Sequence, residues 1–223
     1  MLMFFDVETT GLESCDKICS IAVINEEERY YNLVDEGKKI PPMASSINHI
    51  TNEMIKGKAS LKDSETFKFL QKNNTQDAVI VGHNIKFDSQ KLQEVGFCFE
   101  GRVIDTLRVT KHLIPECEFF SLQFLRYELR LYKNEEEPII PHHALSDSLV
   151  VKELFTYLRD MASVDEMCEL SFKKVLIQKF SFGKYAGSYI EEIAMNDRGY
   201  LEWMLGNVAD LDEDLRYSME YYL

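Results

Sequence analysis

Two acidic residues, one residue apart, follow the first apolar run of the chain. Leu2–Phe5 is typical of a buried strand, Asp6 and Glu8 come directly after it, and a Thr-Thr-Gly turn follows. Residues two apart project from the same face of a strand, so the two carboxylates are expected side by side where the strand ends. Alone, such a pair is typical of a strand running into a polar turn. Adjacent carboxylates repel unless a cation lies between them, so the pair also predicts part of a divalent-metal site.

Two further acids occur at the ends of expected elements. Asp88 follows the expected strand Ala78–Gly82 at the start of a helix, and Asp147 lies in the first turn of another helix. An acid in a first helical turn ordinarily complements the helix dipole. However, open α/β sheets bind ligands at the carboxyl ends of their strands, where Asp88 can meet Asp6 and Glu8. The conjunction of separate acidic groups, each at an element end, favours a shared metal site over capping.

A histidine pair precedes the helix that carries Asp147. The spacing lets Asp147 face the metals while His142 stays on a looser segment above them, and His143 competes for that position. A loop histidine is usually only solvated. Imidazole nevertheless has an ordinary pKa of about 6.5, so a mobile histidine can accept the proton of an attacking water at neutral pH. Two Mg²⁺ or Mn²⁺ ions about 4 Å apart suit four carboxylates, and together these groups predict hydrolysis.

The hydrophobic pattern predicts an α/β domain with a mixed sheet covered by helices. The first three strands are expected to form an antiparallel meander, and the charged segment 134–141 a loop. The expected strands are Leu2–Phe5, Ile18–Ile24, Arg29–Val34, Ala78–Gly82 and Val103–Asp105, and the expected helices are Ser60–Leu70, a helix capped by Asn84 and running to Val95, Leu107–Leu113, Ser121–Leu129 and Ala144–Met161. We place the domain at residues 1–161 and a small second module at residues 163–223, which is rich in glycine and aromatic residues at 180–187 and ends in an amphipathic helix.

Composition excludes several classes of protein. With 223 residues, 45% of them hydrophobic, the chain fits one medium domain and a small appendage. No segment approaches the roughly 20 apolar residues that span a bilayer, and Asp6 interrupts the first run too early for a signal peptide, so we expect a cytoplasmic protein. Its five irregularly spaced cysteines are expected to be free thiols.

The net charge of −13 argues against a protein that grips long nucleic acid by neutralising many phosphates. Contact with nucleic acid is therefore expected to be local. An acidic chain can still act on a phosphodiester if bound cations carry the positive charge at the site.

Three motifs resemble those of the DEDDh 3′→5′ exonucleases, the DnaQ-like group with an RNase H-like fold. They are Phe5–Leu12, His83–Asp88 and His142–Asp147, and they occur in the order of that family. The resemblance covers residues 1 to about 161. It implies an RNase H-like mixed sheet flanked by helices.

The resemblance also implies roles for individual residues. Asp6, Glu8, Asp88 and Asp147 would bind two Mg²⁺ or Mn²⁺ ions, and His142 rather than His143 would take the general-base position. The residues that would contact the terminal nucleotide are Thr9, Gly11 and Leu12, with His49 and Ile50 in the segment Ile47–Thr51 that covers the 3′ end. Relatives often read His-Gly-Ile-Thr in that segment, so Asn48-His49 departs from the pattern. Supporting positions near the site would be His83, Asn84 and Asp105.

The second module resembles the C-terminal region of the exodeoxyribonuclease X group through residues 180–187 and 197–205 and its terminal helix. Lys184 among Tyr185, Phe182 and Trp203 predicts either a small aromatic core or a surface that stacks on single-stranded DNA.

The favoured function is a metal-dependent exonuclease that releases 5′-mononucleotides from DNA 3′ ends, single-stranded ends above all, in repair or recombination. A polymerase-associated proofreading exonuclease like an epsilon subunit, an RNA-trimming relative and a non-catalytic end-binding module are the alternatives. Residues 163–223 favour the independent enzyme over polymerase association, and a homodimer stays open. No membrane contact is expected.

Overall fold

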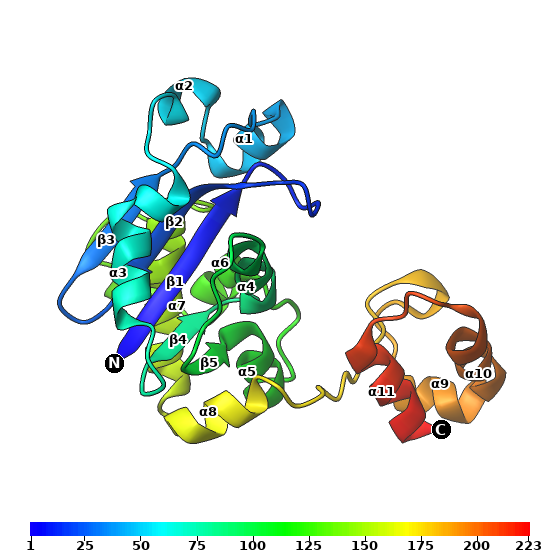
Figure 1. Cartoon of the computed structure of the whole chain (residues 1–223). Coiled ribbons are helices and arrows are strands. Elements are labelled where there is room, and N and C mark those ends of the chain that lie inside the picture. The colour runs from blue at the N-terminus through cyan, green and yellow to red at the C-terminus, as the bar shows by residue number, and fades with distance from the viewer.

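Five strands form one mixed sheet in the order β3-β2-β1-β4-β5 (Figure 1). The computed structural model describes residues 1–223. β1 pairs antiparallel with β2, which pairs antiparallel with β3, whereas β1–β4 and β4–β5 are parallel. The strands are β1 Leu2–Thr9, β2 Ile18–Ile24, β3 Arg29–Leu33, β4 Val79–Gly82 and β5 Arg102–Asp105. The predicted meander and mixed sheet are confirmed, and β1 is the central strand.

Helices cover both faces of this sheet (Figure 1). α3 and α4 pack with Met3, Phe5 and Val7 of β1 on one face, whereas α5, α6, α7 and α8 share a core with Phe4 on the other. The helices of this body are α1 Pro42–Asn48, α2 Asn52–Ile55, α3 Glu65–Asn73, α4 Ile85–Glu94, α5 Thr106–Leu113, α6 Leu122–Glu128, α7 Ala144–Leu158 and α8 Val164–Leu170, with short 3₁₀ turns at Leu61–Asp63 and Leu131–Asn134. The strict alternation along β1 therefore decides which helix layer each of its side chains meets.

Three local expectations differ from the structure. The pattern Ser60–Leu70 is a 3₁₀ turn followed by α3, because the Ser64 hydroxyl accepts a hydrogen bond from Phe67 N–H and begins a new helix there. The helix of Asp147 ends at Leu158, before the expected Met161. The helices α1 and α2 were not expected; both are short and begin without a side-chain cap, so the sequence carries little signal for them.

The C-terminal module has its own core, built from α9 Ile190–Asn196, α10 Arg198–Asn207 and α11 Glu213–Tyr222 after a 3₁₀ turn at Gly183–Tyr185. It lies beside the main body and is joined to it by an extended segment (Figure 1). By packing, the two cores separate after α8 rather than near residue 161, because Met167 of α8 is fully buried in the core of the main body. The helical pattern at 164–170 therefore completes the larger unit.

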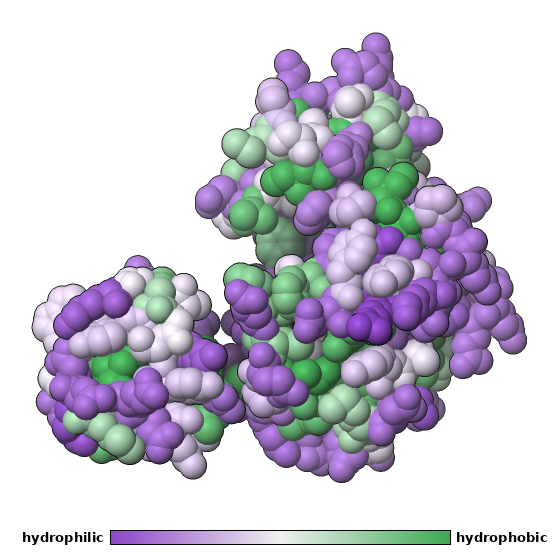
Figure 2. Space-filling model, turned by 180° about the vertical axis from the view of Figure 1, so that it is seen from behind, coloured by the Kyte–Doolittle hydropathy of each residue, from purple (hydrophilic) through white to green (hydrophobic).

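The aromatic segment of the module is partly core and partly surface. Phe180 is buried and packs edge-on against Tyr200, while Phe182 and Trp203 are 48% and 56% exposed. Lys184 lies over the ring of Tyr185 at 4.6 Å and pairs with Asp197. An apolar patch at the centre of the module is visible from behind (Figure 2). The segment thus contributes Phe180 to the aromatic core and leaves Phe182 and Trp203 at the surface.

No helix is both long enough and apolar enough to cross a membrane.

Candidate active site

The site begins with the face of β1 that carries Asp6 and Glu8. Both side chains share a face with Phe4, which packs under α7. They point to the helix layer that carries Asp147 in the first turn of α7. One carboxylate oxygen from each of Asp6, Glu8 and Asp147 lies within 4.8 Å of the other two. The structure thus brings together three of the four predicted acids.

Asp88 reaches the same place from the opposite helix layer. It lies in the first turn of α4, and its Oδ1 accepts a hydrogen bond of 3.2 Å from the backbone N–H of Val7. This contact places Asp88 beside the strand segment between Asp6 and Glu8. Its charge acts on Asp6, although its oxygens lie outside the three-residue group. α4 therefore brings the fourth acid to the edge of the cluster.

Burial and mutual repulsion disfavour the charged forms of these acids. Burial, with the charges of Asp88, Glu8 and Asp147, raises the pKa of Asp6 well above its ordinary value. Burial raises the pKa of Glu8 to about 8, and that of Asp88 to about 7 despite the hydrogen bond from Val7 N–H. Burial also raises the pKa of Asp147 to about 6, although His142 opposes the shift.

No lysine or arginine forms an ion pair with any of the four acids. Buried carboxylates are normally paired or bound to a metal. This cluster therefore has the oxygen donors that Mg²⁺ or Mn²⁺ prefers and lacks a protein cation that would replace the metal.

The two histidines before α7 have different environments. His143 is the N-cap of α7: its Nδ1 accepts a hydrogen bond of 3.4 Å from Ser146 N–H, and its ring lies 4.6 Å from that of Tyr31. His142 is exposed, lies just outside the helix with φ 57°, and acts electrostatically on Asp147. The ring of His143 is thus occupied by packing and capping, which leaves His142 as the histidine free to approach a water at the cluster.

The turn after β1 carries the predicted nucleotide contacts Thr9, Gly11 and Leu12. The Thr9 hydroxyl donates to Gly11 O at 2.7 Å, and Leu12 is 81% exposed. A Cβ on Gly11 would lie 2.4 Å from Oδ2 of Asp16, so only glycine fits the turn. Asp16 in turn accepts a hydrogen bond from the Thr10 hydroxyl and so fixes the loop. The backbone at 9–12 is therefore held, while the apolar side chain of Leu12 is free for a base.

One of the two predicted contacts in the covering segment is corrected. Ile50 is 2% exposed and packs among Ile40 and Ala44, so its side chain is not available to a nucleotide. His49 is exposed at the C-terminus of α1. Asn48, which departs from the pattern of relatives, is buried and donates from Nδ2 to Thr9 O at 3.2 Å. The Asn48 amide thus holds the covering segment against the end of β1.

The supporting positions are linked through backbone groups. Oδ1 of Asp105 accepts hydrogen bonds from Asn84 N–H and Leu107 N–H, which joins the start of α4 to the start of α5. The expected side-chain cap of α4 by Asn84 is wrong. The backbone of Asn84 is left-handed, with φ 59°, and its side chain makes no capping hydrogen bond. His83 contacts Thr106 Oγ1 and Phe120 O, and burial lowers its pKa to about 4. His83 is therefore neutral and links β4 to α5 and to the backbone at Phe120.

Sequence reasoning missed Gln123 on α6. Its Nε2 donates to Oδ1 of Asp147 at 2.8 Å. Nothing in the local pattern distinguishes it from an ordinary exposed-face glutamine, because the partner lies 24 residues away.

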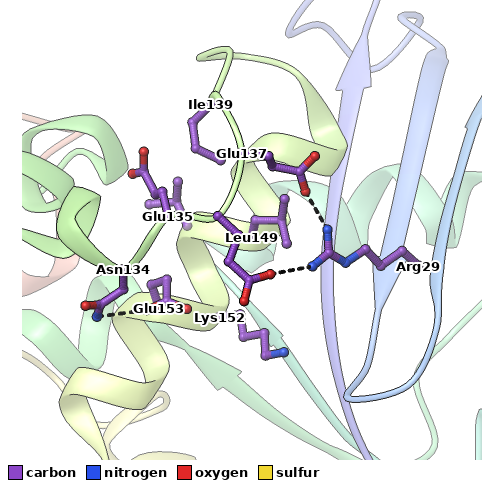
Figure 3. Close-up of a pocket in the computed structure, with 10 residues that line it drawn as sticks. Arg29, Asn134, Glu135, Glu137, Ile139, Leu149, Lys152 and Glu153 are labelled. Atoms are coloured by element: carbon purple, nitrogen blue, oxygen red, sulfur yellow. Dashed lines mark hydrogen bonds and ion pairs between the residues drawn. The ribbon is translucent and has the colours of Figure 1, made fainter.

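A separate surface pocket lies away from these acids (Figure 3). It is lined by Arg29, Glu137 and Glu153, with the loop 134–139 on one side and α7 below. Arg29 pairs there with Glu137 and Glu136. The pocket is an ion-paired seam between the β2–β3 turn and the loop that leads to His142.

Comparison with known families decides the assignment. The family described as Exonuclease matches residues 3–155, which is more than half of the chain. The chain belongs to this exonuclease family. A second family, described as Exodeoxyribonuclease X-like C-terminal, matches residues 180–209. The two matches fall on the main body and on the C-terminal module of this exonuclease.

A relative matches the whole length of the exonuclease, and others match part of it. Exodeoxyribonuclease 10 of Escherichia coli K12 is 27% identical over 229 residues, which cover 100% of this chain and 99% of the relative. The DNA polymerase III subunit epsilon of Treponema pallidum is 30% identical, over 68% of this chain and 73% of that subunit. A solved structure of exonuclease X in complex with 5′-overhanging duplex DNA has a TM-score of 0.61 at 24% identity, over 77% of this chain and 99% of that one. The mixed sheet flanked by helices is thus the predicted RNase H-like fold.

Proposed function

We propose that this exonuclease removes 5′-mononucleotides from DNA 3′ ends in a reaction that depends on two divalent metal ions. The observation that carries the proposal is the convergence of Asp6, Glu8 and Asp147 within 4.8 Å, with Asp88 at its edge. Two Mg²⁺ or Mn²⁺ ions held there would activate the attacking water and stabilise the charge on the leaving oxygen. The named relatives, an exodeoxyribonuclease and a DNA polymerase III subunit, support DNA as the substrate.

His142 is proposed as the general base. A carboxylate engaged with a metal is a poor proton acceptor, whereas the exposed imidazole of His142 can take the proton of the attacking water. His143 is held by Ser146 N–H and Tyr31 and serves as a cap.

The turn after β1 is proposed to hold the terminal nucleotide. Leu12 is exposed where it can lie against a base, and the backbone beside it is fixed by Asp16. His49, exposed at the C-terminus of α1, is proposed to contact the 3′-terminal sugar or phosphate.

The C-terminal module supports an enzyme that acts independently. Residues 180–209 match the exodeoxyribonuclease X-like C-terminal family, and the similarity to exodeoxyribonuclease 10 covers the whole chain. The similarity to the epsilon subunit covers only 68% of the chain. We therefore propose a role in repair or recombination, with association with a polymerase as the second candidate.

The decisive experiment uses 5′-labelled single-stranded DNA, duplex DNA and RNA, each with Mg²⁺, Mn²⁺ or EDTA. We expect a ladder that shortens from the 3′ end of DNA, needs a divalent metal and is absent with Asp6→Asn. Preference for RNA would favour the RNA-trimming alternative. An intact substrate with the folded parent protein in either metal would overturn the proposal, and co-purification with a polymerase would favour proofreading.

A further inference from the structure

A continuous run of polar contacts connects Asp147 to the loop that leads to His142. Gln123 Nε2 donates to Asp147 Oδ1 at 2.8 Å, and Gln123 Oε1 accepts from Arg126 Nη1 at 3.2 Å. Arg126 then donates from Nη2 to Glu135 Oε2 at 2.6 Å and from Nε to the other carboxylate oxygen. Glu135 follows the 3₁₀ turn Leu131–Asn134 and begins the loop before His142. The run thus joins Asp147 to the start of the loop that leads to His142.

The chemistry of the partners fixes the orientation of the Gln123 amide. A guanidinium can only donate hydrogen bonds, so the side of the amide that faces Arg126 must be its oxygen. The NH₂ group must then face Asp147, whose carboxylate can only accept in its ionised form. Gln123 and Arg126 lie three residues apart on α6, which places them on one face of the helix. Arg126 therefore decides which end of Gln123 meets Asp147.

Arg126 also anchors the loop. Its side chain is 9% exposed and that of Glu135 is 13% exposed, and the two-point contact between them leaves little freedom of rotation. Further along, Glu137 pairs with Arg29 (Figure 3). Ile140 N–H donates to Ser146 Oγ of α7 at 3.3 Å. The loop is thus fixed at its start, middle and end, while His142 itself stays exposed.

We propose that Gln123 and Arg126 are positioning residues of this exonuclease: Gln123 orients the carboxylate of Asp147, and Arg126 sets both the Gln123 amide and the loop that carries His142. Neither residue touches the reacting atoms. The inference deepens the proposed function and rests on it, because Asp147 and His142 matter only if they hold metal and accept a proton. Mutation of a residue that hydrogen-bonds to a metal ligand typically lowers metal affinity or activity by about 10- to 100-fold.

The central test replaces Gln123 and measures binding apart from turnover. For Gln123→Leu we expect Mn²⁺ affinity, measured by electron paramagnetic resonance without DNA, to fall about tenfold, and kcat to fall about 10- to 100-fold. KM for a single-stranded oligonucleotide should stay within about twofold, because the turn 9–12 is untouched. Gln123→Glu keeps the acceptor for Arg126 but removes the donor to Asp147, so we expect a loss of similar size. Glu128→Gln, on an exposed position of the same helix, is the matched control and should behave as the parent protein.

A double variant tests the contact between Arg126 and Glu135, which holds the start of the loop. Removing Arg126 alone would leave the half-buried Glu135 uncompensated, so we use Arg126→Met with Glu135→Met. We expect faster amide hydrogen exchange at residues 139–143 and a lower kcat in this variant, whereas Gln123→Leu should leave that exchange unchanged. Adding Gln123→Leu to the pair should lower Mn²⁺ affinity less than it does alone, because the amide is no longer oriented.

The outcomes separate the two ideas. A folded Gln123→Leu protein that binds Mn²⁺ and turns over within twofold of the parent overturns the role of Gln123. Unchanged exchange at 139–143 in the Arg126/Glu135 variant overturns the role of Arg126 in the loop. A parent protein that neither binds Mn²⁺ nor degrades DNA refutes the proposed function itself, and the positioning roles then fall with it.

Discussion

The carboxylates and the histidine of the candidate site are held in opposite ways. Asp6 and Glu8 project from the central strand of the sheet, between paired strands on both sides, and Asp147 is buried in the first turn of a long helix. His142 lies outside that helix on a loop, exposed and with a left-handed backbone. Both regions meet at one place, although only the carboxylates belong to a strand or a helix.

The difference follows from what each group has to do. Groups that hold a metal must keep fixed separations, which strands and helices supply because their backbone hydrogen bonds are complete. A general base must exchange protons with solvent and approach a water, so a partly free side chain suits it better. The anchors at Glu135, Glu137 and Ile140 restrain the loop without burying the imidazole. Substitutions in the two regions should therefore have different signatures.

The largest effect is expected at the carboxylates of the site. Asp6→Asn should abolish turnover while the protein stays folded, because one donor to the metals is lost. Its thermal midpoint in EDTA should equal or exceed that of the parent, since desolvation and the neighbouring acids disfavour the charged form of the half-buried Asp6. Gel-based nuclease assays and thermal unfolding followed by circular dichroism measure the two quantities. A folded variant with full activity would contradict the metal role.

A smaller effect is expected at the loop. His142→Ala should lower kcat by about 10²- to 10⁴-fold and leave Mn²⁺ affinity unchanged within about twofold, because the imidazole moves a proton and is not a ligand. His143→Asn is the matched control: asparagine keeps the cap of α7, so activity should change by less than about threefold. Equal losses in both variants would mean that the two histidines are not distinguished as we describe.

The pH dependence of stability separates the two regions further. The folded-state pKa values of Asp147, Asp88 and Glu8 are raised to about 6, about 7 and about 8. The folded protein therefore keeps protons that the unfolded chain releases near pH 4, and the stability from these groups is lost as the pH rises towards about 8.

In EDTA we accordingly expect a lower thermal midpoint at pH 8.5 than at pH 5.5. Mn²⁺ should restore it at pH 8.5 and have little effect at pH 5.5, where protons compete for the carboxylates. Glu8→Gln should reduce the fall of the metal-free thermal midpoint between pH 5.5 and pH 8.5. The loop substitution His142→Ala should leave the fall towards pH 8.5 in place. A metal-free midpoint that rises between these pH values would show that the acids are not buried as described.

The smallest effect on kcat is expected from substitutions at the contact between the main body and the C-terminal module. Arg108 of α5 pairs with Asp214 of α11 at 2.9 Å, and Asp214 also accepts from Val175 N–H. Asp214→Asn should speed limited proteolysis of residues 172–178 and change kcat on a short oligonucleotide by less than about twofold. Asp210→Asn, at an exposed position, is the control. A large loss of kcat would show that the module reaches the active site.

Sequence patterns predicted the sheet better than its surroundings. β1, β2 and β4 are apolar runs whose strand type is settled within the segment, and the antiparallel meander of the first three strands was expected. The strand order of the whole sheet comes only from the structure. The helices α1 and α2 escaped prediction because neither has a side-chain cap or a long apolar stripe. The sequence pattern placed α8 in the second module, because α8 follows the loop near residue 161. Met167 of α8 packs in the core of the main body, so the two cores separate after α8.

The site shows the same division between local and distant causes. The sequence by itself determined that Asp6 and Glu8 share a face, that Asp88 and Asp147 begin helices, and that a histidine stands before the second of these, because each statement depends only on period and spacing. The tertiary structure decided that these acids meet, that His143 is occupied while His142 is free, that Ile50 is buried, and that Gln123 reaches Asp147. Those contacts join residues far apart in the chain, and only the packing of α4, α6 and α7 around β1 sets their distances.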